Sequence, residues 1–174
     1  MKRQRFCIRR ERPEDLANVH ALVRAAFAAA EHSDGTEQDL VAALRQSAAF
    51  IPALSLVATV DGRPAGHILF TRAHVGQAPV LALAPLAVLP EYRRQGIGGA
   101  LVREGHRIGR GLGHQYSLVL GNARYYGRFG YENARLLGIE APPGLPAAFF
   151  LAARLVKGAP PLRGMAVYAE EFGL

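Results

Sequence analysis

The sequence predicts a mixed α/β (α+β) fold, in which helices flank a sheet that has both antiparallel and parallel neighbours. A strand pattern at residues 6–10 is followed by two helical patterns. An Asp-Gly pair then separates two apolar segments, which is a strong signal for an antiparallel hairpin. Residues 80–120 follow as strand, helix and strand, which predicts a βαβ unit with parallel strands. Because a chain of 174 residues can bury one sizeable core, we expect a single domain over residues 1–174.

The first part of the chain predicts one strand and two helices. Residues 6–10 combine apolar and β-branched side chains. Pro13, followed by two acidic residues, opens a helix in which apolar side chains recur at intervals of three and four as far as Phe27. Thr36, again followed by acidic residues, opens a second helix that includes Leu44.

The central part predicts three successive strands. Residues 55–60 and 63–72 flank the Asp-Gly turn, and residues 80–89 make the third strand. Pro85 lies in the middle of this third strand. Because proline has no N–H to donate to a neighbouring strand, we expect a bulge or a locally unpaired edge at Pro85.

The rest of the chain predicts a helix, a buried strand and a closing strand pair. Apolar residues at turn spacing mark a helix over 97–112, and the apolar run 116–120 is typical of a buried parallel strand. Over residues 137–174, loops rich in proline and glycine separate two apolar segments, 148–156 and 164–168. We expect these two segments to pair with each other as antiparallel strands.

Composition and charge narrow the class of protein. The formal charge of +7 suits nucleic acid, an acidic membrane surface or a phosphorylated cofactor, and does not choose among them. The longest apolar stretch, 78–89, is shorter than the roughly 18 residues that a membrane-spanning helix needs. The first residues leave no room for a secretory hydrophobic segment, so we expect a cytoplasmic protein without a membrane partner. No helix-turn-helix, zinc or RNA-binding signature supports a nucleic-acid partner.

Cysteines and histidines offer no metal site. Cys7 is the sole cysteine, which excludes an internal disulfide and a multi-cysteine metal cluster, and we expect it to be a small buried side chain. Among the histidines, none shows metal-ligand spacing, and we expect His106 and His114 to be exposed.

The segment 90–100 predicts a phosphate site at the start of a helix. Backbone amides and the helix dipole favour an anion there, and glycines allow it to approach the backbone without obstruction by a Cβ atom. Arg93 and Arg94 add full positive charges. The alternative is that the glycines only form a turn and a helix start.

Spacing separates this segment from two well-known nucleotide motifs. A Walker loop requires Lys followed by Ser or Thr after its last glycine, and no such pair follows any glycine in this chain. The dinucleotide motif G-x-G-x-x-G fails because Leu101 stands where the third glycine belongs.

Two segments carry a family resemblance. Residues 93–98, Arg-Arg-Gln-Gly-Ile-Gly, are similar to the [QR]-x-x-G-x-[GA] acetyl-CoA motif of the GNAT superfamily of N-acetyltransferases. Residues 122–131 resemble the family's later N-x-x-[FY]-Y-x-x-x-G-[FY] segment. The resemblance covers residues 5–135 and looks closest to a group of bacterial predicted N-acetyltransferases with L-A-P-L-A-V-L-P-E-Y and Y-Y-G-R-F-G segments.

The resemblance implies a fold and a cofactor. The fold would be the acyl-CoA N-acyltransferase (GNAT) fold, a mostly antiparallel sheet splayed into a V at a bulge in its fourth strand, where Pro85 lies. The cofactor would be acetyl-CoA as co-substrate, with no metal, and its pantetheine arm would enter the split between the strands. The matching cofactor-binding positions are Leu86, Ala87, Val88, Arg93, Arg94, Gln95, Gly96, Ile97, Gly98, Gly99, Asn122 and Tyr125.

The implied reaction moves an acetyl group from acetyl-CoA to a primary amine, of a small molecule or a peptide, by direct attack in a ternary complex. Tyr126 matches the family's general-acid tyrosine, and a phenol stays protonated at pH 7. Tyr125 is the alternative donor, and either tyrosine could instead only pack against the pantetheine channel.

A general base is missing from the expected place, because residues 82–88 contain no carboxylate. Glu31, His32 and Asp34, between the first two helices, are reserve candidates, unless they are solvated loop residues. The alternative function is a non-catalytic acyl-CoA-binding or regulatory domain. The sequence leaves the acceptor and the oligomeric state open, a homodimer included.

Overall fold

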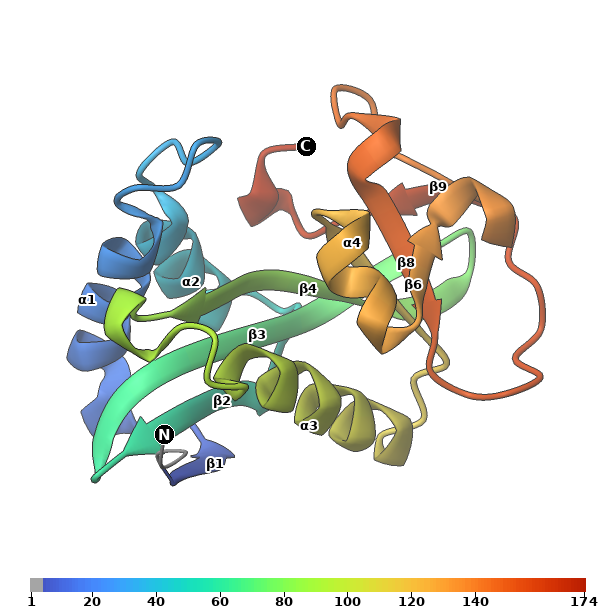
Figure 1. Cartoon of the computed structure of the whole chain (residues 1–174). Coiled ribbons are helices and arrows are strands. Elements are labelled where there is room, and N and C mark those ends of the chain that lie inside the picture. Colours follow the sequence, from blue (N-terminus) through green and yellow to red (C-terminus); the bar gives the residue numbers. More distant parts are fainter. Residues whose placement is uncertain (1–4) are drawn as a thin grey trace.

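The computed structural model describes residues 5–174, which form one mixed sheet flanked by helices (Figure 1). Its strands are β1 Phe6–Arg10, β2 Phe50–Val60, β3 Arg63–Val75, β4 Ala78–Val88, β5 Tyr116–Leu120, β6 Tyr131–Asn133, β7 Ile139–Glu140, β8 Phe150–Arg154 and β9 Gly164–Val167. Its helices are α1 Leu16–Phe27, α2 Glu37–Gln46, α3 Ile97–Gly111 and the short α4 Ala123–Tyr126. Within residues 5–174, no helix is long and apolar enough to cross a membrane.

The strands follow the order β1-β2-β3-β4-β5-β8-β6, with β9 pairing β3 and β7. The predicted β2–β3 hairpin and the parallel β4–β5 pair are both confirmed. The strand β2 begins at Phe50, earlier than the predicted residue 55, and its register with β3 shifts between Phe50 and Ser55. Pro52 lies inside that irregular stretch, which hid its strand character from the sequence pattern.

Helices cover both faces of the sheet. One apolar cluster joins α3 to β2, β3 and β4, with Leu101 and Phe70 fully buried at the contact. A second cluster joins α1 and α2 to the other face, through Val23 and Leu44. In Figure 1, α1 and α2 lie at the far end of β3 and β4 from α4, and α3 crosses in front of the long strands.

The middle of β4 contains the predicted bulge. Pairing with β3 shifts between Leu83 and Leu86, on either side of Pro85. Before the bulge, β4 pairs with β5 over Leu81 to Leu83, whereas Leu86 to Val88 have no partner in β5 within the described part of the chain. The strands β4 and β5 therefore part at Pro85, and the last residues of β4 keep a free edge on that side.

The predicted pairing of the two C-terminal segments is wrong. The strand β8 inserts between β5 and β6, whereas β9 pairs with β3 and β7. The physical reason lies in their side chains. Residues Phe150 to Ala153 are all buried, as in a central strand covered on both faces, while β9 alternates between buried and more exposed positions, as a strand covered on one face does.

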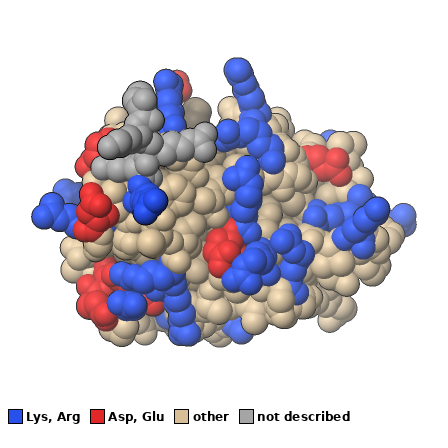
Figure 2. All heavy atoms as spheres, turned by 60° about the horizontal axis from the view of Figure 1, so that its bottom comes forward, with Lys and Arg blue, Asp and Glu red and all other residues tan. Residues whose placement is uncertain are grey.

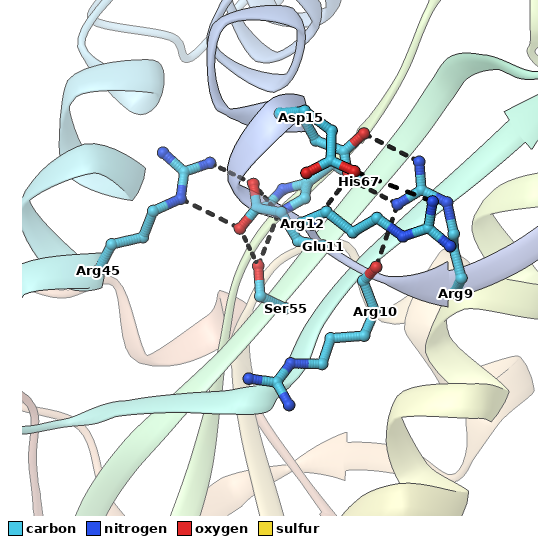
Figure 3. A network of polar contacts seen from close by, with 9 residues as sticks. Arg9, Arg10, Glu11, Arg12, Asp15, Arg45, Ser55 and His67 are labelled. Carbon is cyan, nitrogen blue, oxygen red and sulfur yellow. Dashed lines mark hydrogen bonds and ion pairs between the residues drawn. The ribbon is translucent and has the colours of Figure 1, made fainter.

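A polar network fastens α2 to the sheet (Figure 3). The Arg45 guanidinium, from α2, donates two hydrogen bonds to the Glu11 carboxylate. The Ser55 hydroxyl, from β2, donates to the same carboxylate at 2.7 Å and lies 3.1 Å from His67 Nε2 on β3. Because these side chains are nearly all shielded from water, the network joins three elements inside the protein.

The environment of Cys7 corrects one prediction. Cys7 is exposed rather than buried. The strand β1 is an edge strand of the sheet, and Cys7 alternates with the partly buried Phe6 and Ile8, so its side chain lies on the solvent face.

Candidate active site

A cavity of about 1290 Å³ opens where β4, the loop after it, the start of α3 and α4 meet. Most of the predicted cofactor positions line it. They are Leu86, Ala87, Val88, Arg93, Arg94, Gln95, Gly96, Ile97, Gly98, Gly99 and Tyr125, and the predicted catalytic residue Tyr126 lines it as well. Residues that are far apart in the sequence thus share one space, which begins at the free edge of β4.

The loop before α3 has the backbone of an anion site. Gly96 adopts φ 90°, the left-handed region, at the N-cap of α3, and no side chain caps this helix. The amides of the first turn of α3 therefore lack side-chain partners where the helix dipole is positive. Arg94 also has a positive φ, of 60°, which helps to reverse the chain direction here.

Arg93 has a different environment from Arg94. Its guanidinium donates to the backbone oxygen of Ala26 at 2.6 Å and to that of Val88 at 3.3 Å. Arg93 thus ties the loop to the end of α1 and to the end of β4. Both side chains are exposed at the cavity, but among the described residues the Arg94 guanidinium has no hydrogen-bond acceptor, so its charge is more open to an incoming anion.

The two tyrosines occupy different parts of the cavity. Their rings meet edge to face, with centroids 5.0 Å apart at 83°. The Tyr125 hydroxyl lies beside the start of α3, where a Cβ atom on Gly98 would be 2.6 Å from the hydroxyl oxygen. The Tyr126 ring instead rests against Gly121 at the end of β5. Burial raises the pKa of both phenols, most strongly for Tyr126, so both are protonated at neutral pH.

The Tyr126 ring packs against Tyr131, whose hydroxyl belongs to a buried group of hydrogen-bonded side chains. The Tyr131 ring meets the Tyr126 ring edge to face, with centroids 5.6 Å apart. The Tyr131 hydroxyl lies 2.7 Å from Ser117 Oγ and 2.9 Å from His106 Nε2. Because these hydrogen bonds satisfy the buried Tyr131 hydroxyl, they fix the ring against which Tyr126 packs.

His106 corrects a prediction of exposure. Its position on α3 turns it toward the sheet, where it is buried next to the Phe70 ring. Burial, with a smaller effect of the Arg110 charge, lowers its pKa from 6.5 to about 4. His114 is half-buried rather than exposed. Burial of His106 is acceptable because its ring has a polar partner, the Tyr131 hydroxyl. Tyr131 is distant in the sequence, so no local pattern predicts that His106 is buried.

Asn122 does not line the cavity. Its side-chain oxygen accepts a hydrogen bond from the Arg124 amide at 2.8 Å and caps α4. Its contact with a cofactor therefore stays a prediction.

The reserve base candidates lie in the exposed connection between α1 and α2. Asp34 accepts hydrogen bonds from the hydroxyl and, with a smaller effect, from the amide of Thr36, and both lower the pKa of its carboxyl. Asp34 lines a smaller cavity of about 370 Å³, which shares Phe27 and Ala30 with the large one. Glu31 and His32 line neither cavity. Among the described residues that line the large cavity, none carries a carboxylate.

Sequence reasoning missed seven residues of the large cavity: Ala26, Phe27, Ala30, Tyr92, Arg103, Arg128 and Phe129. Arg103 lies one turn after Gly99 on α3, and this spacing could have placed it on the cavity side. Arg128 and Phe129 lie within the second motif segment, and their position there was the available signal. Within residues 5–174, no group of three His, Cys, Asp or Glu residues is placed to hold a metal ion.

A sheet that parts at a bulge in β4, next to an uncapped helix start, defines the class of acyltransferases that bind an acyl-CoA. The model of the Acetyltransferase (GNAT) family matches residues 18–131. The chain therefore belongs to the GNAT family of acetyl-CoA-dependent N-acetyltransferases, which confirms the fold and the enzyme class predicted from the sequence.

Two curated relatives come from Escherichia coli strain K12. The uncharacterized N-acetyltransferase YjhQ is 47% identical over 115 residues, which cover 63% of this chain and 64% of that protein. The alignment thus spans slightly less than two thirds of YjhQ. The uncharacterized N-acetyltransferase YhbS is 36% identical over 146 residues, which cover 82% of this chain and 83% of that protein.

Two solved structures are similar over nearly the whole chain. YhbS from Escherichia coli in complex with CoA has a TM-score of 0.85 at 32% identity, covering 98% of this chain and 93% of that one. A GNAT family acetyltransferase from Brucella melitensis in complex with acetyl-CoA has a TM-score of 0.80 at 34% identity, covering 97% and 99% of the two chains.

Proposed function

We propose that this protein transfers the acetyl group of acetyl-CoA to a primary amine, by direct attack in a ternary complex. The observation that carries the proposal is one cavity that joins the uncapped start of α3 to the free edge of β4. The uncapped helix start suits a pyrophosphate, and the free strand edge suits the amide groups of a pantetheine arm. CoA and acetyl-CoA in the two similar structures support this assignment.

The cofactor has two kinds of contact in this proposal. The amides from Gln95 to Gly99 bind the pyrophosphate, with Arg94 adding charge. The backbone of Leu86, Ala87 and Val88 offers strand-like hydrogen bonds to the pantetheine arm, because β5 does not take that edge. The thioester then lies near the bulge of β4, where the two halves of the sheet part.

The proposed chemistry needs one proton donor. The amine nitrogen attacks the acetyl carbonyl carbon, the C–S bond breaks, the amine loses a proton, and the departing thiolate gains one. Tyr126 is the proposed donor, since its hydroxyl stays protonated and its ring lies away from the phosphate loop. Tyr125 is better placed to contact the cofactor near Gly98. Burial raises the pKa of Tyr126 further above that of a thiol, so the proton transfer to the thiolate is uphill. The proton that the amine loses returns through water to the Tyr126 phenolate, and product release completes the reaction.

The acceptor amine is proposed to be weakly basic. Since no carboxylate is among the described residues that line the cavity, the amine must reach it already neutral. At pH 7 this costs roughly 4 to 5 kcal/mol for a lysine-like amine, and roughly 1 to 2 kcal/mol for an α-amine of pKa about 8. A small-molecule amine or a peptide N-terminus of low pKa therefore fits best. A cytoplasmic location and the absence of a nucleic-acid partner stay predictions.

The test combines binding and turnover. Acetyl-CoA should raise the melting temperature of the protein, and free thiol should appear with at least one member of a panel of primary amines, polyamines, aminoglycosides and peptide N-termini. Stabilisation without turnover across the panel would support the alternative, a non-catalytic acyl-CoA-binding domain. Absence of binding would exclude both functions.

A further inference from the structure

Two arginines from different elements meet at one aromatic ring on the rim of the cavity. The guanidinium carbon of Arg103, on α3, lies 5.1 Å from the centroid of the Phe129 ring. That of Arg128, in the 3-10 turn after α4, lies 5.4 Å from the same centroid and 4.5 Å from that of Tyr125. Cation–π attraction thus holds two like charges, from two different elements, at one ring of the cavity lining.

Neither charge is neutralised within the protein. Among residues 5–174, no ion pair is formed by Arg103 or Arg128, whereas Arg107, one turn further along α3, pairs with Glu104 at 2.7 Å. The Nε of Arg128 donates a hydrogen bond to the Tyr125 carbonyl oxygen, and its terminal nitrogens remain available for another partner. Two unpaired guanidinium groups repel each other, and a bound anion would remove that repulsion.

Positive charge alone does not distinguish Arg103 and Arg128 from the other basic residues of the protein. Figure 2 shows Lys and Arg side chains in several separate groups over the face it presents, with acidic residues between some of them. What distinguishes Arg103 and Arg128 is that both line the cavity and both are oriented by its aromatic rings.

The pair lies next to the proposed pyrophosphate site. A Cβ atom on Gly99 would lie 3.1 Å from Arg103 Nη1, so this guanidinium borders the first turn of α3. CoA carries a further phosphate on the same nucleotide, the 3′-monoester, which has nearly two negative charges at pH 7. A guanidinium fork suits such a group, because it can donate two parallel hydrogen bonds. Arg93 is less suited, since its Nε and one of its terminal nitrogens already donate to carbonyl oxygens of β4 and α1.

We propose that Arg103 and Arg128 bind the 3′-phosphate of the cofactor and make the enzyme selective for CoA over 3′-dephospho-CoA. The inference rests on the proposed function, because it assumes that CoA occupies the cavity.

The experiment measures the dissociation constants of CoA and of 3′-dephospho-CoA by calorimetry. The proteins are the wild type, Arg103→Gln, Arg128→Gln and the double variant. We expect the wild type to bind CoA about tenfold or more tightly than 3′-dephospho-CoA, as charge-assisted hydrogen bonds warrant. Each single variant should lose part of this preference and the double variant most of it, while affinity for 3′-dephospho-CoA changes less than about twofold.

The matched control is Arg107→Gln, which removes a charge from the same helix outside the cavity and should keep the full preference. Equal binding of the two nucleotides by the wild type would overturn the inference. So would a double variant that keeps the preference, or one that loses affinity for both nucleotides to the same extent. A folded wild type that binds neither nucleotide would overturn the proposed function itself.

Discussion

Tyr125 and Tyr126 are neighbours in the sequence but have different surroundings. The Tyr125 hydroxyl faces Gly98 and the phosphate loop, and Tyr126 lies against Gly121, backed by Tyr131. The sequence motif of residues 122–131 alone left both tyrosines as candidate proton donors. The structure supports Tyr126 because a proton donor must reach the thioester, and the free edge of β4 extends away from the loop toward the end of β5.

Tyr126→Phe tests the proposed proton donor. We expect kcat to fall by roughly a hundredfold or more, because the thiolate then leaves without a general acid. The dissociation constant of acetyl-CoA should stay within about twofold, since the ring and its packing remain. Steady-state kinetics and calorimetry measure the two quantities. Turnover at the wild-type rate would exclude Tyr126 as the acid.

Tyr125→Phe is the matched variant, because it removes the same atom one residue away. We expect weaker acetyl-CoA binding with a kcat close to that of the wild type. If instead Tyr125→Phe lost kcat and Tyr126→Phe did not, the two roles would have to be exchanged.

At the scale of elements, α3 is held on the sheet by a very close contact. The Phe70 ring of β3 packs directly over Gly105, and an added Cβ atom would overlap with it. Phe70 is fully buried, so its ring has little space to move. Gly105→Ala should therefore destabilise the protein by about 1 to 3 kcal/mol despite the better helix propensity of alanine.

Gly111→Ala is the control for Gly105→Ala. Gly111 ends the same helix, and nothing lies within 4 Å of an added Cβ atom there. This variant should be neutral or more stable by up to about 1 kcal/mol. Urea unfolding of both variants measures the difference, and equal stabilities would show that α3 can shift away from β3 without cost.

The polar network of Glu11, Arg45, Ser55 and His67, called the α2 anchor from here on, gives a second prediction at the scale of elements. Arg45→Met leaves the Glu11 carboxylate buried with Ser55 as its remaining hydrogen-bond donor. We expect a loss of about 3 kcal/mol in the free energy of unfolding, because a buried charge without its counter-ion is costly. Arg10→Met is the control, since the Arg10 side chain is exposed and points away from the network in Figure 3. Similar urea midpoints for the two variants would contradict a stabilising role of the Arg45–Glu11 ion pair.

Elements with a strong local pattern, and the parallel β4–β5 pair of the βαβ unit, were predictable from the sequence, whereas the pairing of the C-terminal strands was not. The hairpin of β2 and β3, the helix α3 and the bulge at Pro85 each depend on a local signal, and each is confirmed. The partners of β8 and β9 depend on which surfaces remain to be covered after the other strands have assembled. The proposed phosphate loop rests on a local signal as well, and its residues line the cavity, whereas the contact of Arg103 with the Phe129 ring depends on how α3 packs against the segment after α4.

At the scale of the whole molecule, two histidines from different apolar clusters are buried without charge. His67 lies in the α2 anchor, and His106 lies behind the candidate site. Burial lowers the pKa of His67 from 6.5 to about 4, with opposing smaller effects of Glu11 and Arg45. His106 is lowered to about 4 as well, mainly by burial. Both faces of the sheet therefore contain a group that resists protonation in the folded state.

These histidines predict an acid-sensitive fold. Between pH 6.5 and about 4, the unfolded chain binds protons that folded His67 and His106 exclude, so stability falls as the pH falls through this window. The full effect is on the order of 3 kcal/mol for each histidine and is constant above pH 6.5. Urea unfolding at several pH values from 7.5 to 4.5 measures it. In a His67→Gln/His106→Gln variant, which keeps hydrogen-bonding side chains, the free energy of unfolding should change much less over this range. An equally steep decline in that variant would assign the acid sensitivity to the carboxylates instead.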